Sequence, residues 1–289
     1  MSPDFTLTEL TRRRPEVYFI GSAIFHYLGP SFAVLLFTVV DPFGVAWLRI
    51  VTAAAVFAVW RRPWRAWQAA ERRERTTVLL WGVLLALMNT SFYLAIDLLP
   101  LGTVAAIEFL GPIVIAAFAV RRLRNLAAVA LAIVGVGVLS EVRFAGAPLG
   151  FTFAFINMAL FAGYIVIAHR VSRHQHLNGI DGLAAAMIIA GIAGLPLGIA
   201  DALPVFADPV ILGAAVGVGI SSSVIPYVFD QLAMRRMPRG TYALLSALLP
   251  ATATAIGVLV LWQIPTGPEI AGVSLVIAAV ATHEDRSPG

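Results

Sequence analysis

Ten apolar stretches, separated by short polar connections, occupy nearly all of this chain. They run over residues 17–37, 43–60, 77–96, 102–120, 126–140, 149–168, 182–200, 209–232, 240–262 and 268–283. A helix needs about 20 apolar residues to cross the hydrocarbon core of a bilayer. The 289 residues therefore hold ten such helices and little else. The pattern predicts an all-α, polytopic membrane protein with ten transmembrane helices and no separate soluble domain.

Arginines are confined to alternate connections. All 20 basic residues are arginine, and all except Arg49 and Arg143 lie before the first stretch or after an even-numbered one. The other connections carry acids instead, namely Asp41, Asp97, Glu141, Asp201, Asp208 and Glu269. Because arginine in short loops stays on the cytoplasmic side, the alternation supports the count of ten. It also predicts an inner (plasma) membrane protein with both termini in the cytoplasm.

A short passage occurs twice, 138 residues apart: PLGTVA starts at residue 100 and PRGTYA at residue 238. An acid precedes the first copy and two arginines precede the second, so the copies should face opposite sides of the membrane. Five helices per half is an odd number, and a duplicated half then inserts upside down. We expect an inverted repeat of residues 1–145 and 146–289, an architecture common in secondary transporters. The residues expected to shape its helices are Pro100, Gly102, Gly111, Pro112, Pro226, Pro238, Gly240 and Pro250.

The residue content argues against several classes of function. Charged residues make up 12% of the chain, about half of the share usual in soluble domains. Cysteine is absent, so neither a disulfide framework nor a thiolate metal site is expected. The sequence contains no Ser-His-Asp arrangement, zinc-ligand spacing or phosphate-binding glycine loop. We therefore expect no enzyme activity, cofactor, metal or nucleic-acid partner.

Glu108 is the first candidate for a functional group. A charge inside a bilayer costs about 2.5–3.5 kcal/mol on insertion scales, so such groups usually face a cavity or a partner. Glu108 stands one turn before Pro112, whose ring removes the backbone hydrogen bond to the carbonyl of residue 108. A carboxylate beside loosened backbone predicts a site for a proton or a substrate amine. A structural hydrogen bond within the bundle is the alternative.

The eighth apolar stretch carries a polar face. Ser223, Pro226, Tyr227 and Asp230 follow one another at i, i+3, i+4 and i+7, so they share one side of a helix. We expect that side to face a cavity. Asp230 lies close to the cytoplasmic end of the stretch, where it either contributes to transport or is merely interfacial.

Other polar groups lie inside the apolar stretches. Asn89, Tyr93, Asn157 and Tyr164 suit a small amphipathic ligand, although packing between helices explains them equally well. His26 titrates near neutral pH and can relay protons, but a buried histidine is more often a packing residue. For Arg49, pairing with a carboxylate is favoured over contact with substrate.

These residues resemble the motifs of EamA-type members of the drug/metabolite transporter superfamily, most closely those of the threonine/homoserine exporter branch. The resemblance rests on VAWLR at 45–49, FYLAI at 92–96, PLG at 100–102, EFLGP at 108–112, IPY at 225–227, and the segment from 241 to 250. It extends over most of the chain, and the EFLGP stretch is its most specific part.

The resemblance implies ten helices in two inverted halves and the export of amino acids or related metabolites. Glu108 matches the acidic residue that the branch has in its fourth helix, and Asp230 stands where the branch has a glutamate. Two positions depart from the family, because Leu249 and Gln263 stand where it often has glutamate.

We expect an exporter of amino acids such as threonine or homoserine that works by alternating access and proton antiport, with Glu108 as the titrating group. Its partners are then a small-molecule substrate, protons and the lipid bilayer. The 17 phenylalanines leave export of aromatic or drug-like compounds as an alternative. A membrane scaffold is the alternative outside transport.

Overall fold

The computed structural model describes residues 16–111, 113, 123–143, 147–171, 174–177, 179–234 and 248–282, and all of their regular structure is helical. The first half contains α2 (Glu16–Leu36), α3 (Pro42–Arg61), α4 (Trp64–Ala69), α5 (Arg72–Leu98), α6 (Leu101–Glu108) and α8 (Leu123–Arg143). The second contains α9 (Pro148–Val171), α10 (Gly179–Ala202), the 3₁₀ turn η1 (Leu203–Ala207), α11 (Pro209–Gly219), the π-turn η2 (Ile220–Val224), α12 (Ile225–Met234), α14 (Leu249–Leu261) and α15 (Gly267–Thr282).

Each of the ten predicted stretches overlaps a helix, which confirms the all-α polytopic class. Six helical segments are long and apolar enough to cross a membrane: Val17–Leu36, Pro42–Arg61, Arg72–Leu98, Pro148–Ala168, Gly179–Ala207 and Pro209–Asp230. Leu126–Val138, Leu249–Leu261 and Gly267–Thr282 are shorter apolar helices. Residues 112, 114–120, 240–247 and 283 of the predicted stretches lie outside the described residues.

Polar residues extend or start helices beyond the apolar stretches. Helix α5 begins at Arg72, five residues before the third predicted apolar stretch. This early start is possible because Glu71 and Glu74 form a capping box with each other's backbone. Such a box satisfies two backbone N–H groups that a helix start leaves unpaired. Asp208 starts α11 in a similar way, since its carboxylate accepts hydrogen bonds from the backbone nitrogens of Val210 and Ile211 at 2.8 and 3.2 Å.

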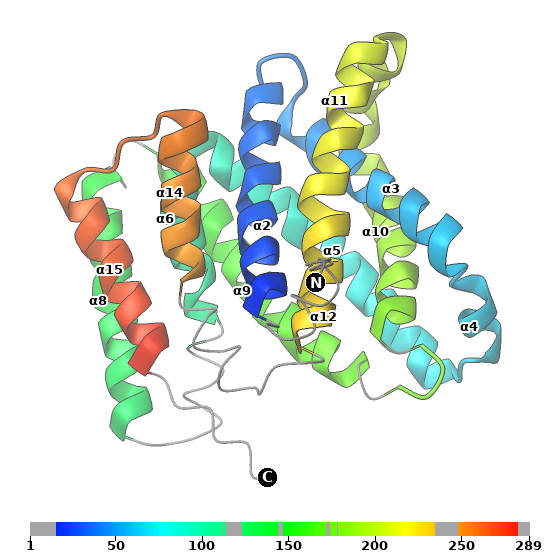
Figure 1. Ribbon diagram of the computed structural model, residues 1–289, viewed down its shortest axis with the longest axis horizontal. Helices are drawn as coiled ribbons and strands as arrows, with labels where there is room; N and C mark the ends of the chain where they lie inside the picture. Colours follow the sequence, from blue (N-terminus) through cyan, green and yellow to red (C-terminus); the bar gives the residue numbers. More distant parts are fainter. Residues whose placement is uncertain are drawn as a thin grey trace, which may run out of the picture.

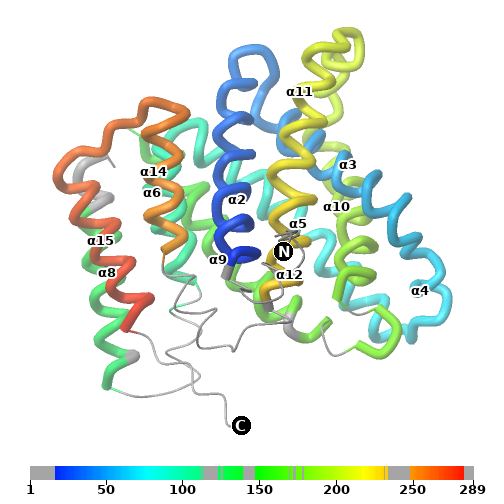
Figure 2. The backbone as a smooth tube through the Cα atoms, in the orientation of Figure 1, coloured from blue at the N-terminus to red at the C-terminus, as the bar shows by residue number. Residues whose placement is uncertain are grey.

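The helices pack side by side into one bundle, with helices from the two halves of the chain interleaved (Figure 1). α8 and α15 form one edge, and α6 and α14 lie next to them. α2 stands at the centre, between α14 on one side and α11 and α12 on the other (Figure 2). α3, α5 and α10 pack together beyond it, and α9 packs on α5 and α6. The first half of the chain therefore makes its main contacts with the second half.

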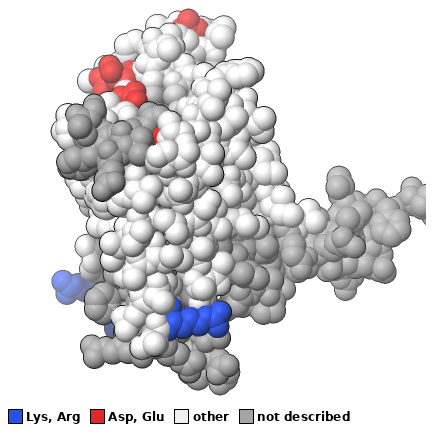
Figure 3. All heavy atoms as spheres, turned by 90° about the vertical axis from the view of Figure 1, so that its left-hand side faces the viewer, with Lys and Arg blue, Asp and Glu red and all other residues white. Residues whose placement is uncertain are grey.

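Apolar side chains cover the outside of the bundle, whereas polar ones lie within it. Large hydrophobic residues such as Leu80, Ile192, Val210 and Leu259 are between 59% and 80% exposed, as is expected of a surface that faces lipid. On the side formed by α8 and α15, acidic residues lie towards one end and arginines towards the other (Figure 3). The described part of the chain thus has the polarity that the sequence predicts.

Candidate functional site

Glu108 and Asn157 meet inside the bundle. Glu108 is the last residue of α6 and is 6% exposed. Its Oε1 accepts a hydrogen bond of 3.2 Å from Nδ2 of Asn157 in α9, which is fully buried. The chain just after α6 also lies close to α9. A Cβ at Gly111 would come within 2.8 Å of the Met158 carbonyl oxygen. The close approach brings the acid and the amide together.

Arg49 of α3 lies 5% exposed beside the π-turn. Its Nε donates to Oγ of Ser223 at 2.6 Å and its Nη2 donates to the carbonyl oxygen of Ser222 at 3.0 Å. Its Cζ lies 5.2 Å from the centre of the Tyr93 ring, within the range of a cation–π interaction. The ion pairs among the described residues do not include Arg49. The expected pairing with a carboxylate is therefore wrong for this part of the chain, because the π-turn supplies neutral acceptors instead.

Aromatic rings from three helices surround these charges. The His26 ring lies edge-on to Tyr27 and to Tyr227, with centres 5.6 and 6.3 Å apart. Tyr27 and Tyr93 pack in the same buried cluster as Ile107 and Phe109, the residues on either side of Glu108. The hydroxyls of Tyr27 and Tyr93 and Oδ1 of Asn157 are buried without a hydrogen bond to any described residue. Buried polar atoms are normally bonded, so these three are available to water or to a ligand. We call Arg49, Glu108, Asn157, His26, Tyr27, Tyr93 and Tyr227 the central cluster.

The polar face of the eighth predicted stretch lies against α2 and α3. Ser223 contacts Arg49, and the Tyr227 ring lies against His26. Half-buried Asp230 accepts a hydrogen bond of 2.6 Å from Oγ of Ser22, which also reaches the Pro226 carbonyl at 3.2 Å. The sequence did not predict the π-turn that precedes this face. π-turns often occur at functional sites.

The remaining predicted residues are dispersed. Asn89 is buried and donates to the Leu85 carbonyl of its own helix at 2.8 Å, and Tyr164 stacks on Phe161, with ring centres 5.9 Å apart. Gly102 is packed against Thr254, which leaves no room for a methyl group. Pro100 precedes α6, while Pro226 and Pro250 lie in the first turns of α12 and α14. Pro112, Pro238 and Gly240 lie outside the described residues.

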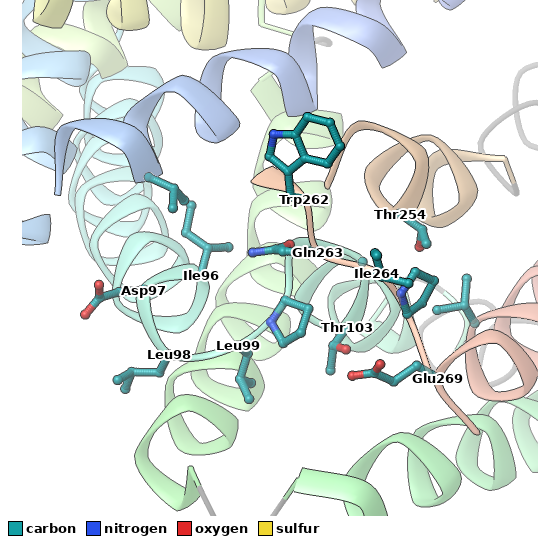
Figure 4. A pocket seen from close by; sticks show the side chains of 15 residues that line it. Ile96, Asp97, Leu98, Leu99, Thr103, Thr254, Trp262, Gln263, Ile264 and Glu269 are labelled. Carbon is teal, nitrogen blue, oxygen red and sulfur yellow. The ribbon is translucent and has the colours of Figure 1, made fainter. Parts of the chain in front are cut away.

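A separate pocket of about 500 Å³ opens where α5 ends and α6 begins, beside the connection between α14 and α15. Asp97, Thr103, Gln263 and Glu269 are among its lining residues (Figure 4). Oε1 of Gln263 accepts a hydrogen bond of 3.0 Å from the backbone nitrogen of Leu101, which fastens the α14–α15 connection to the start of α6. An amide can therefore fill a structural role at this departure from the family pattern.

Sequence reasoning missed this pocket and the partners of Arg49. The pocket residues come from five helices and the connections between them, and nothing in their spacing shows that these segments meet. The serines at 221–223 were a usable signal, because hydroxyl groups often bind the backbone within helices and bend them.

Apolar helices that surround buried charged and polar groups, with a pocket at one end, define a multi-pass membrane transport protein. A family model described as the EamA-like transporter family matches residues 148–282. The threonine/homoserine exporters RhtA of Salmonella typhimurium strain LT2 and Escherichia coli strain K12 are 32% and 30% identical to this chain over 258 and 261 residues. Each alignment covers 87% of this chain and 84% of the relative. The chain therefore belongs to the EamA-like transporter family.

A solved crystal structure with 21% sequence identity supports the same fold. It aligns over 93% of this chain and 96% of its own, with a TM-score of 0.57. Membership of a transporter family also confirms the expectation that this protein is a transporter and not an enzyme.

Proposed function

We propose that this protein exports small metabolites, and most specifically amino acids of the threonine and homoserine type, in exchange for protons. The observation that carries the proposal is the buried Glu108 carboxylate. Its Oε1 is bound by Asn157, while its Oε2 makes no hydrogen bond to any described residue. A carboxylate in this position can hold either a proton or a substrate ammonium group. Competition of the two for one group couples their opposite movements.

Alternating access between two inverted halves is the proposed transport mechanism. With an offset of 138 residues, α3 corresponds to α10 and α8 to α15. The two helices of each pair pack on each other, as related elements do next to a two-fold axis. The other contacts agree, since α2 packs on α12 as its counterpart α9 packs on α5. This pairing supports a repeat whose halves can rock against each other.

The test is uptake of threonine into proteoliposomes under an imposed pH gradient that is acidic inside. We expect the gradient to accelerate uptake by the wild-type protein. Glu108→Gln should remove the response to the gradient and lower the driven rate by at least about tenfold, the effect of losing an essential protonation site. The control is Asp41→Asn, which changes an exposed acid at the start of α3. Wild-type rates of Glu108→Gln at every pH would refute the proposal.

Export of aromatic compounds is the second candidate. It is favoured by a row of rings on α5, α6 and α9, in which the Tyr164 ring lies between Trp81 and Phe161, and the Phe161 ring in turn contacts Phe109. Such rings bind flat apolar ligands well. A thermal-stability screen separates the two candidates, because stabilisation by aromatic amines without stabilisation by threonine would support the second.

A further inference from the structure

Arg49 is a buried charge whose hydrogen-bond acceptors are both neutral. A guanidinium has five N–H donors and stays charged at any physiological pH. The structure gives two hydrogen bonds to this one, from Nε to a serine hydroxyl and from Nη2 to a backbone carbonyl. Both acceptors are neutral, and no described carboxylate lies within ion-pair distance. A buried charge without an ion-pair partner is costly, so this site suits a ligand that brings a negative charge to the guanidinium.

The central cluster also contains the opposite charge. Glu108 has one oxygen without a hydrogen bond to any described residue, and Oδ1 of its neighbour Asn157 is a buried acceptor in the same state. These oxygens accept hydrogen bonds, whereas Arg49 can only donate them. Tyr93, which lies against Arg49, packs in the same buried cluster as Ile107 and Phe109, the residues on either side of Glu108. One buried cluster thus offers donors for an anion and acceptors for a cation.

We propose that Arg49 is the specificity-determining residue that binds the carboxylate of an exported amino acid, while Glu108 and Asn157 receive its ammonium group. The inference rests on the proposed function, and it assigns the recognition of each half of the zwitterion. The planar guanidinium matches a carboxylate through two parallel hydrogen bonds. Its present partners, Ser222 and Ser223, are neutral, so a carboxylate can replace them without breaking an ion pair. Stacking on Tyr93 holds the guanidinium plane meanwhile.

The experiment compares two ligands that differ only in the group that Arg49 should bind. L-threonine and its methyl ester both carry the ammonium, but the ester lacks the carboxylate. Each competes with radiolabelled threonine for the purified protein in proteoliposomes. We expect the wild-type protein to prefer threonine by at least about tenfold, the scale of a charge-assisted hydrogen-bonded pair. In Arg49→Gln the affinity for threonine should fall by about that factor, while the affinity for the ester stays unchanged.

Two further variants complete the experiment. Glu108→Gln should weaken the binding of both ligands, since both carry the ammonium group. Arg49→Lys keeps the charge but loses the planar guanidinium, so it should weaken the binding of threonine more than the binding of the ester. If Arg49→Gln does not elute as a folded protein, Arg49→Lys decides the question. Equal losses for both ligands in the Arg49 variants would overturn the inference and leave threonine export standing. A wild-type protein that binds and transports no threonine would instead refute the proposed function.

Discussion

Single hydroxyl groups hold the polar side chains of this bundle in place, and Ser22 is the clearest case. Its Oγ donates to Asp230 at 2.6 Å and also reaches the Pro226 carbonyl. Ser22→Ala removes that donor from a half-buried carboxylate. We expect the free energy of unfolding to fall by about 1 kcal/mol, as for other hydrogen bonds between membrane helices. Unfolding in mixed detergent micelles measures the change.

The control for this prediction is Ser221→Ala. The Ser221 hydroxyl bonds only to the Val218 carbonyl of the same helical segment, at 3.2 Å. Ser221→Ala should lower the free energy of unfolding much less than Ser22→Ala does, because no second helix is involved. Equal costs for the two variants would show that the contact between Ser22 and Asp230 contributes nothing to stability.

At the residue scale, the sequence predicted which polar groups lie in spans but not which residues they contact. Glu108 stood out because a carboxylate in an apolar stretch is costly. Arg49 stood out for the same reason, yet its partners are 173 and 174 residues away. Their identity depends on how α3 and the π-turn meet, and no local pattern contains that information. Tyr27 was not singled out as a site residue, because one tyrosine in a span is not unusual.

At the scale of elements, close approach between helices depends on glycine. α2 meets the π-turn at Gly29, where a Cβ would lie 2.6 Å from the backbone nitrogen of Ser222. A backbone atom has no rotamer by which to move aside, so Gly29→Ala must push α2 away. We expect a loss of about 1–3 kcal/mol, as for other overpacked sites. A lowered melting temperature, followed by size-exclusion chromatography of heated samples, would show it.

Gly213→Ala in α11 is the matched control. An added Cβ at Gly213 meets no atom within 4 Å, and alanine is the better helix former by about 1 kcal/mol. This variant should melt at the wild-type temperature or slightly above it. If both alanine variants melted alike, the contact between α2 and the π-turn would not be tight.

Apolar periodicity predicted where the helices lie, but it did not predict their irregularities. Every predicted span contains a helix, since only helices satisfy their own backbone within lipid. The segment after α3 also forms a short helix, Trp64–Ala69, because Pro63 sets the backbone that starts it. The π-turn interrupts a stretch whose hydropathy is uniform. Neither feature changes the apolar pattern, so that pattern does not reveal them.

At the scale of the whole molecule, the orientation in the membrane can be tested directly, because the chain contains no cysteine. Ile264 lies exposed in the connection between α14 and α15, and Gln68 lies exposed at the end of α4. We propose that these positions face opposite sides. A membrane-impermeant maleimide should label Ile264→Cys in intact cells, and should label Gln68→Cys only after permeabilisation. The reverse pattern would contradict cytoplasmic termini.

The arrangement of the two halves exceeds what the sequence alone could predict. The repeated passage and the alternating arginines led to the expectation of two related halves. They did not show that the halves interleave, so that α3 packs on α10 and α8 packs on α15. Such contacts join residues well over 100 positions apart in the sequence. Only the packed molecule shows which helices surround the central cluster.

The π-turn at Ile220–Val224 has a consequence for how the span that starts at Pro209 is drawn. A π-turn accommodates one more residue than an α-turn, and each residue of an α-helix corresponds to a rotation of about 100°. α11 and α12 are therefore out of phase, and one helical wheel from Pro209 onwards gives the wrong azimuth to everything after Val224. Deleting a single serine here should convert the π-turn into an α-turn and leave Tyr227 and Asp230 facing α2, whereas straightening the turn at its present length should rotate both away from α2.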